Sequence, residues 1–302
     1  MSATLFKLLL LIPLIVTNVC SQLYGFDVMH FEVAYSLILI FLLGIPHGAM
    51  DHIIFKKERK QYSHLFTAFY WTLGLSNAVL WFFFPLEVTF FFILLSAFHF
   101  GEAQFSNHAY LKRQLVFVIC WGMAIISLLL SKNIPQLAAY VQSNHNPVFY
   151  QQVLLYLENQ QIVLGFVAIT LLFKVYYWAS NKITGYFFLR EFLFFSTIML
   201  FMNFSSIVVG ITTFFVFGHS LHVLEQEYRY LKKDNPSFGL LDFVKVIFPF
   251  SILSYVMGGL LFALSLFEVL NISQASLILI MLSSLTLPHA VVMHIFYRTK
   301  RS

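Results

Sequence analysis

Apolar runs of about 20 residues recur along the whole chain, and they constrain its fold more than any other feature. A run of this length is what an α-helix needs to cross a hydrocarbon layer of about 30 Å. Of the 302 residues, 60% are hydrophobic and only 10% are charged, whereas about a quarter of the residues of a soluble domain are charged. A membrane β-barrel would show shorter segments of alternating polarity. The sequence therefore predicts an all-α, polytopic membrane helical bundle.

The runs predict about ten transmembrane helices in a single integral-membrane domain, residues 1–302. The expected spans are 5–21, 33–54, 65–84, 86–105, 114–131, 160–179, 186–202, 204–224, 243–267 and 273–296. With a cytoplasmic N-terminus, this division puts every lysine and arginine except Lys132 on the cytoplasmic side, as the positive-inside rule requires. Both termini are then cytoplasmic. The first span could be a signal-anchor, and the absence of a small-residue cleavage site favours an uncleaved helix.

The remaining composition excludes several other classes of protein. The net charge of +5 is accounted for by basic residues that flank membrane helices, so we expect no nucleic-acid partner. Cys20 and Cys120 lie far apart and form neither a disulfide framework nor a Cys-x-x-Cys site. The 37 phenylalanines suit core and lipid-facing positions, and some could line a tunnel for a long apolar ligand. The longest outer loop, 132–159, is expected to lie along the membrane interface.

Seven of the eleven histidines gather in four short motifs at one depth of the predicted bundle. The motifs are "PHGAMDH" (His47, His52), "FHFGE" (His99), "GHSLH" (His219, His222) and "PHAVVMH" (His289, His294). Each motif ends a span that runs from outside to inside, so all four lie in the cytoplasmic leaflet. Ionisable residues inside a bilayer are costly and usually face the bundle interior. One such histidine could simply bridge two helices, but four motifs at one depth predict a shared metal site, since imidazole is a common ligand.

Spacing suggests which side chains face the site. His219 and His222 are three residues apart, so both could reach one ion from the same helix face. The pairs in the first and last motifs are five apart, about 140° around an ideal helix, and each should supply one inner and one peripheral imidazole. Helical spacing also puts Asp51 on one face with His47, Glu102 with His99, and Glu225 and Gln226 with His222. Such polar neighbours suit supporting positions that fix imidazole tautomers. Prolines precede the first and last motifs and remove backbone donors, so we expect bent helices there.

The donor set leaves several kinds of metal protein open. Imidazole ligands without a thiolate cluster fit Fe, Zn, Cu or Ni. Glu102 could act as the general base of a zinc hydrolase, but there is no His-Glu-x-x-His motif. A di-iron hydroxylase or desaturase would carry His-His pairs, which this chain lacks. A b-type haem protein, a retinal or carotenoid carrier and an opsin-assembly factor are further alternatives, whereas the broken half-helices of a transporter are not evident.

The four motifs resemble, in the same order, those of the Brp/Blh family of bacterial and archaeal β-carotene 15,15′-dioxygenases. The matching stretches, between residues 44 and 296, are "GIPHGAMDH", "FHFGEAQF", "FVFGHSLH" and "TLPHAVVMH". The resemblance implies a multi-pass enzyme of the prokaryotic cytoplasmic membrane with non-haem Fe(2+) held by four histidines. It also implies that dioxygen cleaves the central double bond of β-carotene to give two all-trans-retinal molecules, a product suited to a retinal-binding rhodopsin.

Carried over to this chain, the resemblance implies three iron ligands, His47, His99 and His219. The family's fourth histidine follows the third by four residues, where this chain has Val223. We therefore expect His222 to be the fourth ligand, with His289 as its substitute if a local bulge turns His222 away. The other candidates, for supporting or alternative positions, are His52, His294, Asp51 and Glu102.

Overall fold

A computed structural model of the chain describes residues 29–131, 160–203, 206–267 and 274–299, together with residues 16, 19, 23 and 272. Within these residues the chain forms helices and no strand. The all-α prediction is therefore confirmed for the described part of the chain. The expected first span, 5–21, lies almost wholly outside the described residues, and so does the expected outer loop, 132–159.

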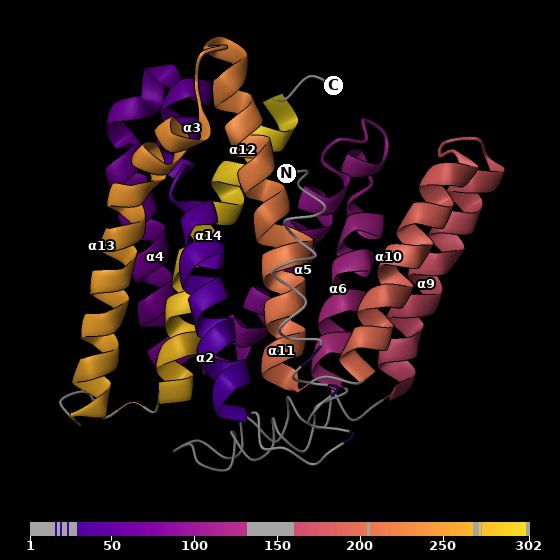
Figure 1. Cartoon of the computed structure of the whole chain (residues 1–302), viewed down its shortest axis with the longest axis horizontal. Helices are drawn as coiled ribbons and strands as arrows, with labels where there is room; N and C mark the ends of the chain where they lie inside the picture. Colours follow the sequence, from indigo (N-terminus) through magenta and orange to yellow (C-terminus); the bar gives the residue numbers. More distant parts are fainter. Residues whose placement is uncertain are drawn as a thin grey trace.

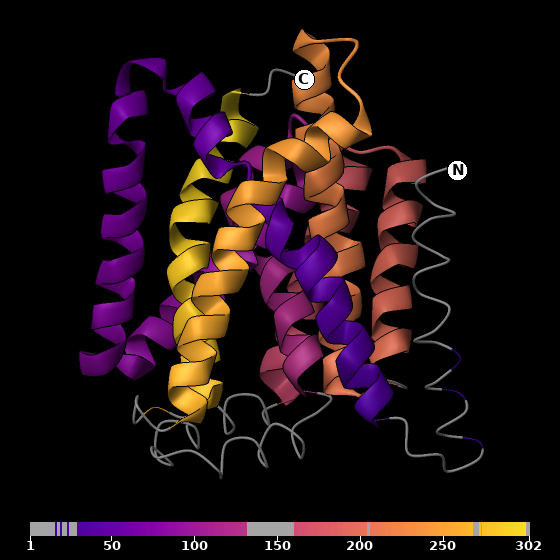
Figure 2. The ribbon, with the colours of Figure 1, turned by 60° about the vertical axis from the view of Figure 1, so that its left-hand side comes forward.

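The helices stand side by side with their long axes roughly parallel (Figure 1). In chain order the elements are α2 (Met29–Leu39), η1 (Ile40–Gly44), η2 (Ile45–Gly48), α3 (Asp51–Glu58), η3 (Lys60–Leu65), α4 (Phe66–Phe83), α5 (Pro85–Phe105), η4 (Leu111–Arg113), α6 (Leu115–Ser131), α9 (Gln160–Ala179), α10 (Gly185–Asn203), α11 (Ile207–Thr212), η5 (Thr213–Ser220), α12 (Leu221–Asp234), α13 (Leu240–Leu266) and α14 (Gln274–Thr299). In Figure 1 helices α4 and α13 lie at one end of the molecule and α9 and α10 at the other. In the turned view of Figure 2, α4 lies at the left edge and α13 crosses the front of the bundle.

Six described segments are long and apolar enough to cross a membrane. They are His30–Glu58, Lys60–Phe83, Pro85–Phe105, Gln161–Ala179, Leu240–Leu266 and Ser276–Thr299. Each corresponds to one of the ten expected spans. Helix α6 is apolar but shorter, while α10 and the run from α11 to α12 occupy the other two expected positions within the described residues. The chain is thus a multi-helix membrane protein, and the count of ten spans is not confirmed.

Close glycine contacts join α5 to α6. A Cβ added to Gly101 would overlap the carbonyl oxygen of Val118, and a Cβ added to Gly122 would overlap that of Ala97. Small residues allow membrane helices to approach at backbone distance, where van der Waals packing holds them together. This contact fixes the position of α5, the helix that carries His99.

Two of the stretches that depart from α-helical winding adjoin histidine motifs. The π-helix η1 and the 3₁₀-helix η2 separate α2 from α3, and Pro46 stands in the first turn of η2. The second stretch, η5, is a π-helix in which the Ser220 hydroxyl donates a hydrogen bond to the Phe215 carbonyl (2.9 Å). Helix α14, by contrast, continues through Pro288. Short π-helical segments occur frequently at functional sites, and both of these lead directly into a histidine motif.

Candidate metal centre

Four histidines from four separate elements form a closed ring of neighbouring imidazoles. His47 comes from η2, His99 from α5, His219 from η5 and His289 from α14. The centroid of the His47 ring lies 5.2 Å from that of His219 and 4.8 Å from that of His289. The centroid of the His99 ring lies 4.8 Å from that of His219 and 4.9 Å from that of His289. All four side chains are buried.

Three of these histidines satisfy the geometry of a metal site on their own. His47, His99 and His219 each offer a ring nitrogen, and these atoms all lie within 4.8 Å of one another. His289 lies beside the rings of His47 and His99, so it completes the group opposite His219. The nitrogens are close enough to converge on one ion by small side-chain movements, since metal–imidazole bonds are about 2 Å long.

The ring nitrogens of this group are buried without hydrogen-bond partners. These are both nitrogens of His99, Nε2 of His219 and Nε2 of His289. Burying a polar atom without a partner is costly. Each neutral imidazole has one lone-pair nitrogen, so these three neighbouring rings require something that accepts three lone pairs. A metal cation meets that requirement, so the residues present fit a metal centre. The buried triad of His47, His99 and His219 could hold a metal ion.

Hydrogen bonds set the tautomers of two of the four imidazoles. His47 Nδ1 donates to the carbonyl of Gly44 within the π-helical turn. His289 Nδ1 donates to both carboxylate oxygens of Asp51, at 2.9 and 3.0 Å. Each bond leaves Nε2 as the lone-pair nitrogen, the form in which a metal ligand is oriented by a partner on its other side.

Asp51 is held in turn by a residue that sequence reasoning did not identify. The Tyr70 hydroxyl, on α4, donates to Asp51 Oδ2 at 2.8 Å. The Asp51 carboxylate is itself buried, with 2% of its surface exposed. The sequence had suggested His47 as the partner of Asp51 by helical spacing, whereas the actual partner, His289, is 238 residues away. No local signal marks Tyr70, because its contact with Asp51 is made only when α4 packs beside α3.

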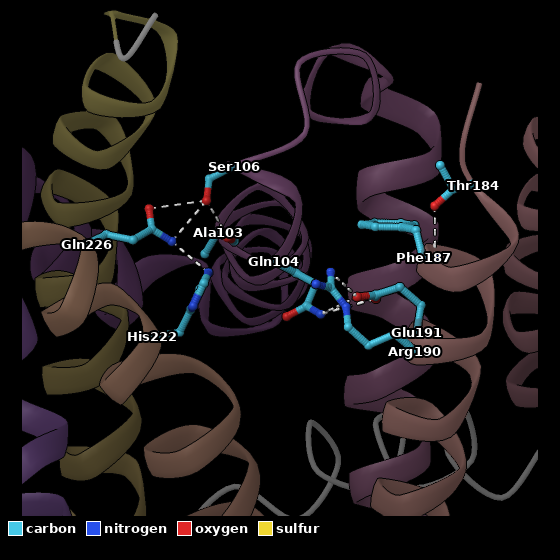
Figure 3. A network of polar contacts seen from close by, with 9 residues as sticks. All are labelled: Ala103, Gln104, Ser106, Thr184, Phe187, Arg190, Glu191, His222 and Gln226. Atoms are coloured by element: carbon cyan, nitrogen blue, oxygen red, sulfur yellow. Dashed lines mark hydrogen bonds and ion pairs between the residues drawn. The ribbon is translucent and has the colours of Figure 1, made fainter. Parts of the chain in front are cut away.

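His222 does not join the four-histidine ring. Its Nε2 accepts a hydrogen bond from the Gln226 side-chain amide at 2.6 Å, and Gln226 also donates to the Ser106 hydroxyl at 3.0 Å. Figure 3 shows His222 directed at this pair. The structure therefore brings together three of the four ligands expected from sequence and places His289, the expected substitute, where His222 had been expected.

The second histidines of the first and last motifs are peripheral. His52 lies with its ring centroid 3.8 Å from that of Phe250, and its Nδ1 donates to the Ala49 carbonyl at 3.2 Å. His294 Nδ1 donates to Glu102 Oε1 at 2.7 Å. Glu102 is thus engaged with His294 on α14, although its spacing from His99 had suggested a supporting role behind that ligand.

Phenylalanine side chains border the histidine ring. Phe215 stands edge-on to His47 with ring centroids 5.5 Å apart, and Phe100 lies 4.7 Å from His219. Phe100 also contacts Phe214 at 5.2 Å. Apolar neighbours lower the local dielectric and exclude water from a site. The four histidines therefore face surroundings suited to an apolar ligand rather than to a hydrated one.

The fold and this site define a class: a helical membrane protein with a buried, imidazole-lined centre that could hold a metal. Comparison with protein families gives a more specific result. The family model "Beta-carotene 15,15'-dioxygenase" matches residues 38–297, and the chain belongs to this family. The resemblance of the four motifs is thereby confirmed. The protein is a carotenoid-cleaving enzyme of the family that opens the central double bond of β-carotene. Comparisons with curated proteins and with solved structures gave no match.

Proposed function

We propose that His47, His99, His219 and His289 hold one Fe(2+), with which this enzyme uses dioxygen to convert β-carotene into two all-trans-retinal molecules. The observation that carries the proposal is the convergence of four buried imidazoles from four elements, three of which have ring nitrogens without hydrogen-bond partners. His289 replaces His222 as the fourth ligand, because the Nε2 of His222 is engaged with Gln226. The family supplies the substrate and the reaction.

The chemistry of the donor set supports iron. Neutral imidazoles suit Fe, Zn and Cu, and Zn has no redox activity, whereas insertion of dioxygen into a double bond requires a redox-active metal. Bound among these histidines, Fe(2+) would supply the activation of dioxygen. The protein's own residues contribute position and dryness: Asp51 orients His289, and Phe100 and Phe215 exclude water beside the ligands. The rod-like polyene would pass these aromatic side chains with its central bond at the histidine ring.

The remaining features of the proposed enzyme concern its place in the membrane. We propose a single domain, residues 1–302, with ten spans and with both termini in the cytoplasm of a prokaryotic cell. The concentration of lysines and arginines at one side of the expected spans supports this orientation. In that topology the histidine ring lies in the cytoplasmic leaflet. Retinal formed there would supply a retinal-binding rhodopsin in the same membrane.

Replacement of His99 by alanine tests the proposal directly. His99 is the only histidine of α5, so no neighbour on its helix can substitute for it. In cells that make β-carotene, the wild-type protein should remove the orange colour and form retinal, and His99→Ala should form about ten-fold less or lower, equivalent to about 1.4 kcal/mol in barrier.

The matched control is His64→Ala, which removes an exposed histidine of η3. It should leave retinal formation unchanged. Equal activity of the two variants, with both proteins present in the membrane, would contradict a catalytic role for the histidine ring. If neither the variants nor the wild-type protein formed retinal, the proposed reaction would be contradicted.

A further inference from the structure

Lys174 is a buried lysine that the histidine ring does not use. It lies in α9, inside a segment long enough to span the membrane. Only 3% of its surface is exposed, and its Nζ has no hydrogen-bond partner. Ionisable side chains within transmembrane segments are rare and usually mark a functional site or find a partner. A buried amine without a hydrogen-bond partner therefore indicates a position where a ligand could bind.

A buried carboxylate lies within electrostatic reach of this amine. Glu191 precedes Phe195 by four residues on α10, so the two side chains share one helix face, and the Lys174 Nζ lies 5.5 Å from the centroid of the Phe195 ring. Among the described residues no ion pair joins Lys174 and Glu191. Instead, Glu191 accepts hydrogen bonds from the Gln104 side-chain amide at 3.2 and 3.1 Å, and from Arg190 at 3.3 Å (Figure 3). These bonds hold the carboxylate in place from α5 and α10, so it is a fixed negative charge beside a lysine that it does not contact directly.

Apolar side chains connect Lys174 with the histidine ring. The Lys174 Nζ lies 5.5 Å from the centroid of the Phe195 ring. Phe195 and Phe214 belong to one buried hydrophobic cluster, against which Phe100 packs. Phe100 in turn lies 4.7 Å from His219. One continuous apolar cluster therefore lies between the histidine ring and the lysine.

The reaction of the family generates the functional group that reacts with an amine. Oxidative cleavage of a carbon–carbon double bond leaves an aldehyde on each fragment. A lysine desolvated in a hydrophobic pocket is the type of side chain with which enzymes form Schiff bases to carbonyl compounds. Such an imine keeps its positive charge when a carboxylate stands nearby.

We propose that Lys174 captures the retinal product as a protonated Schiff base, with Glu191 as its counterion. Nζ forms a bond to the aldehyde carbon, the carbon–oxygen double bond is replaced by a carbon–nitrogen double bond, and the oxygen leaves as one water molecule. The positive charge of the lysine remains on the imine nitrogen, and neither an oxidant nor a reductant is consumed. Addition of water reverses the step and releases the aldehyde. Capture would retain an apolar product that otherwise partitions freely into lipid.

This inference rests on the proposed function for the identity of the product, but its test does not depend on cleavage. All-trans-retinal is added in the dark to the purified protein in detergent, the imine is reduced with sodium borohydride, and digested peptides are analysed by mass spectrometry. The retinyl group should be found on Lys174. Lys174→Arg should lower the trapped adduct about ten-fold or more, whereas Lys182→Arg, which alters an exposed lysine just beyond α9, should leave it unchanged.

A second variant tests the counterion. A protonated retinylidene imine absorbs at longer wavelength than free retinal, and Glu191→Gln should weaken this band in the unreduced complex while Lys174 is still present. Adducts spread equally over Lys174 and Lys182, or an undiminished adduct in Lys174→Arg, would overturn the proposal. Retention of β-carotene cleavage by Lys174→Arg shows that this variant is folded. A wild type that binds retinal on Lys174 but cleaves no β-carotene would contradict the proposed function alone.

Discussion

Replacing Asp51 by asparagine should weaken iron binding without altering the shape of the site. Asp51 accepts two contacts from His289 Nδ1, at 2.9 and 3.0 Å, and one from the Tyr70 hydroxyl at 2.8 Å. An asparagine has the same size and keeps one acceptor oxygen. It loses the negative charge and the second acceptor, so it can no longer orient His289 and accept from Tyr70 as the carboxylate does.

The magnitude follows from the kind of interaction that is lost. Removing a partner that orients a metal-bound histidine costs about ten- to a hundred-fold in metal affinity, which corresponds to about 1.4–2.7 kcal/mol. The loss of one hydrogen bond to a charged group, about 1.5–3 kcal/mol, gives the same range. We therefore expect the dissociation constant for Fe(2+) to rise by about one to two orders of magnitude in Asp51→Asn.

The assay is competition for Fe(2+) between the purified protein and a chelator of known affinity, under anaerobic conditions. Asp242→Asn is the matched control, because Asp242 is an exposed aspartate that caps α13 by accepting from the Gly239 backbone at 2.9 Å. It should leave iron affinity unchanged. An Asp51→Asn variant that binds iron as tightly as the wild type would refute the reasoning that connects Asp51 to the metal through His289.

Two further predictions concern packing and pH. Gly122→Ala should destabilise the protein by about 1–3 kcal/mol or more, because the new methyl group overlaps the Ala97 carbonyl. Its thermal unfolding midpoint in detergent should be lower than that of Gly165→Ala, a position where the new methyl group meets no atom within 4 Å. Equal midpoints would contradict the close α5–α6 contact. Burial and the nearby charge of Asp51 raise the pKa of Glu227, in α12, well above its ordinary value of 4.5. The folded state therefore keeps a proton that the unfolded state loses, so stability should fall as the pH rises above 4.5. Glu227→Gln should flatten that dependence, and an unchanged slope would contradict the prediction.

The grouping of the histidines was accessible from sequence because depth in a membrane follows from position along a span. His47, His99, His219 and His289 each lie late in a segment that runs in the same direction, and the structure brings their rings together. Local patterns thus predicted that these histidines gather and which elements carry them, while the depth of the group in the membrane stays a prediction. The count of ten spans is not confirmed: α6 is shorter than the six long apolar segments, and η5 separates α11 from α12.

The choice between His222 and His289 required the actual winding of the chain. Ideal α-helical spacing put His219 and His222 on one face, but His219 lies in a π-helix, where the Leu221 amide donates to the Val216 carbonyl five residues earlier. The wider turn changes the angular relation of neighbouring side chains. Nothing in the letters of the sequence reveals a π-helix. The partner of Asp51 was likewise inaccessible, because it depends on helices that pack across a long sequence separation. The contact of His222 with Gln226, four residues later on the same helix, instead follows ordinary helical spacing.

The most direct test of the metal centre compares two histidine replacements, His289→Ala and His222→Ala. Iron content after purification and retinal formed per protein are measured for both. The account predicts that His289→Ala loses about ten-fold or more in both quantities, whereas His222→Ala retains bound iron and activity close to the wild type, because the Nε2 of His222 contacts Gln226 rather than the histidine ring. Loss of iron in His222→Ala with full retention in His289→Ala would contradict the proposed ligand set.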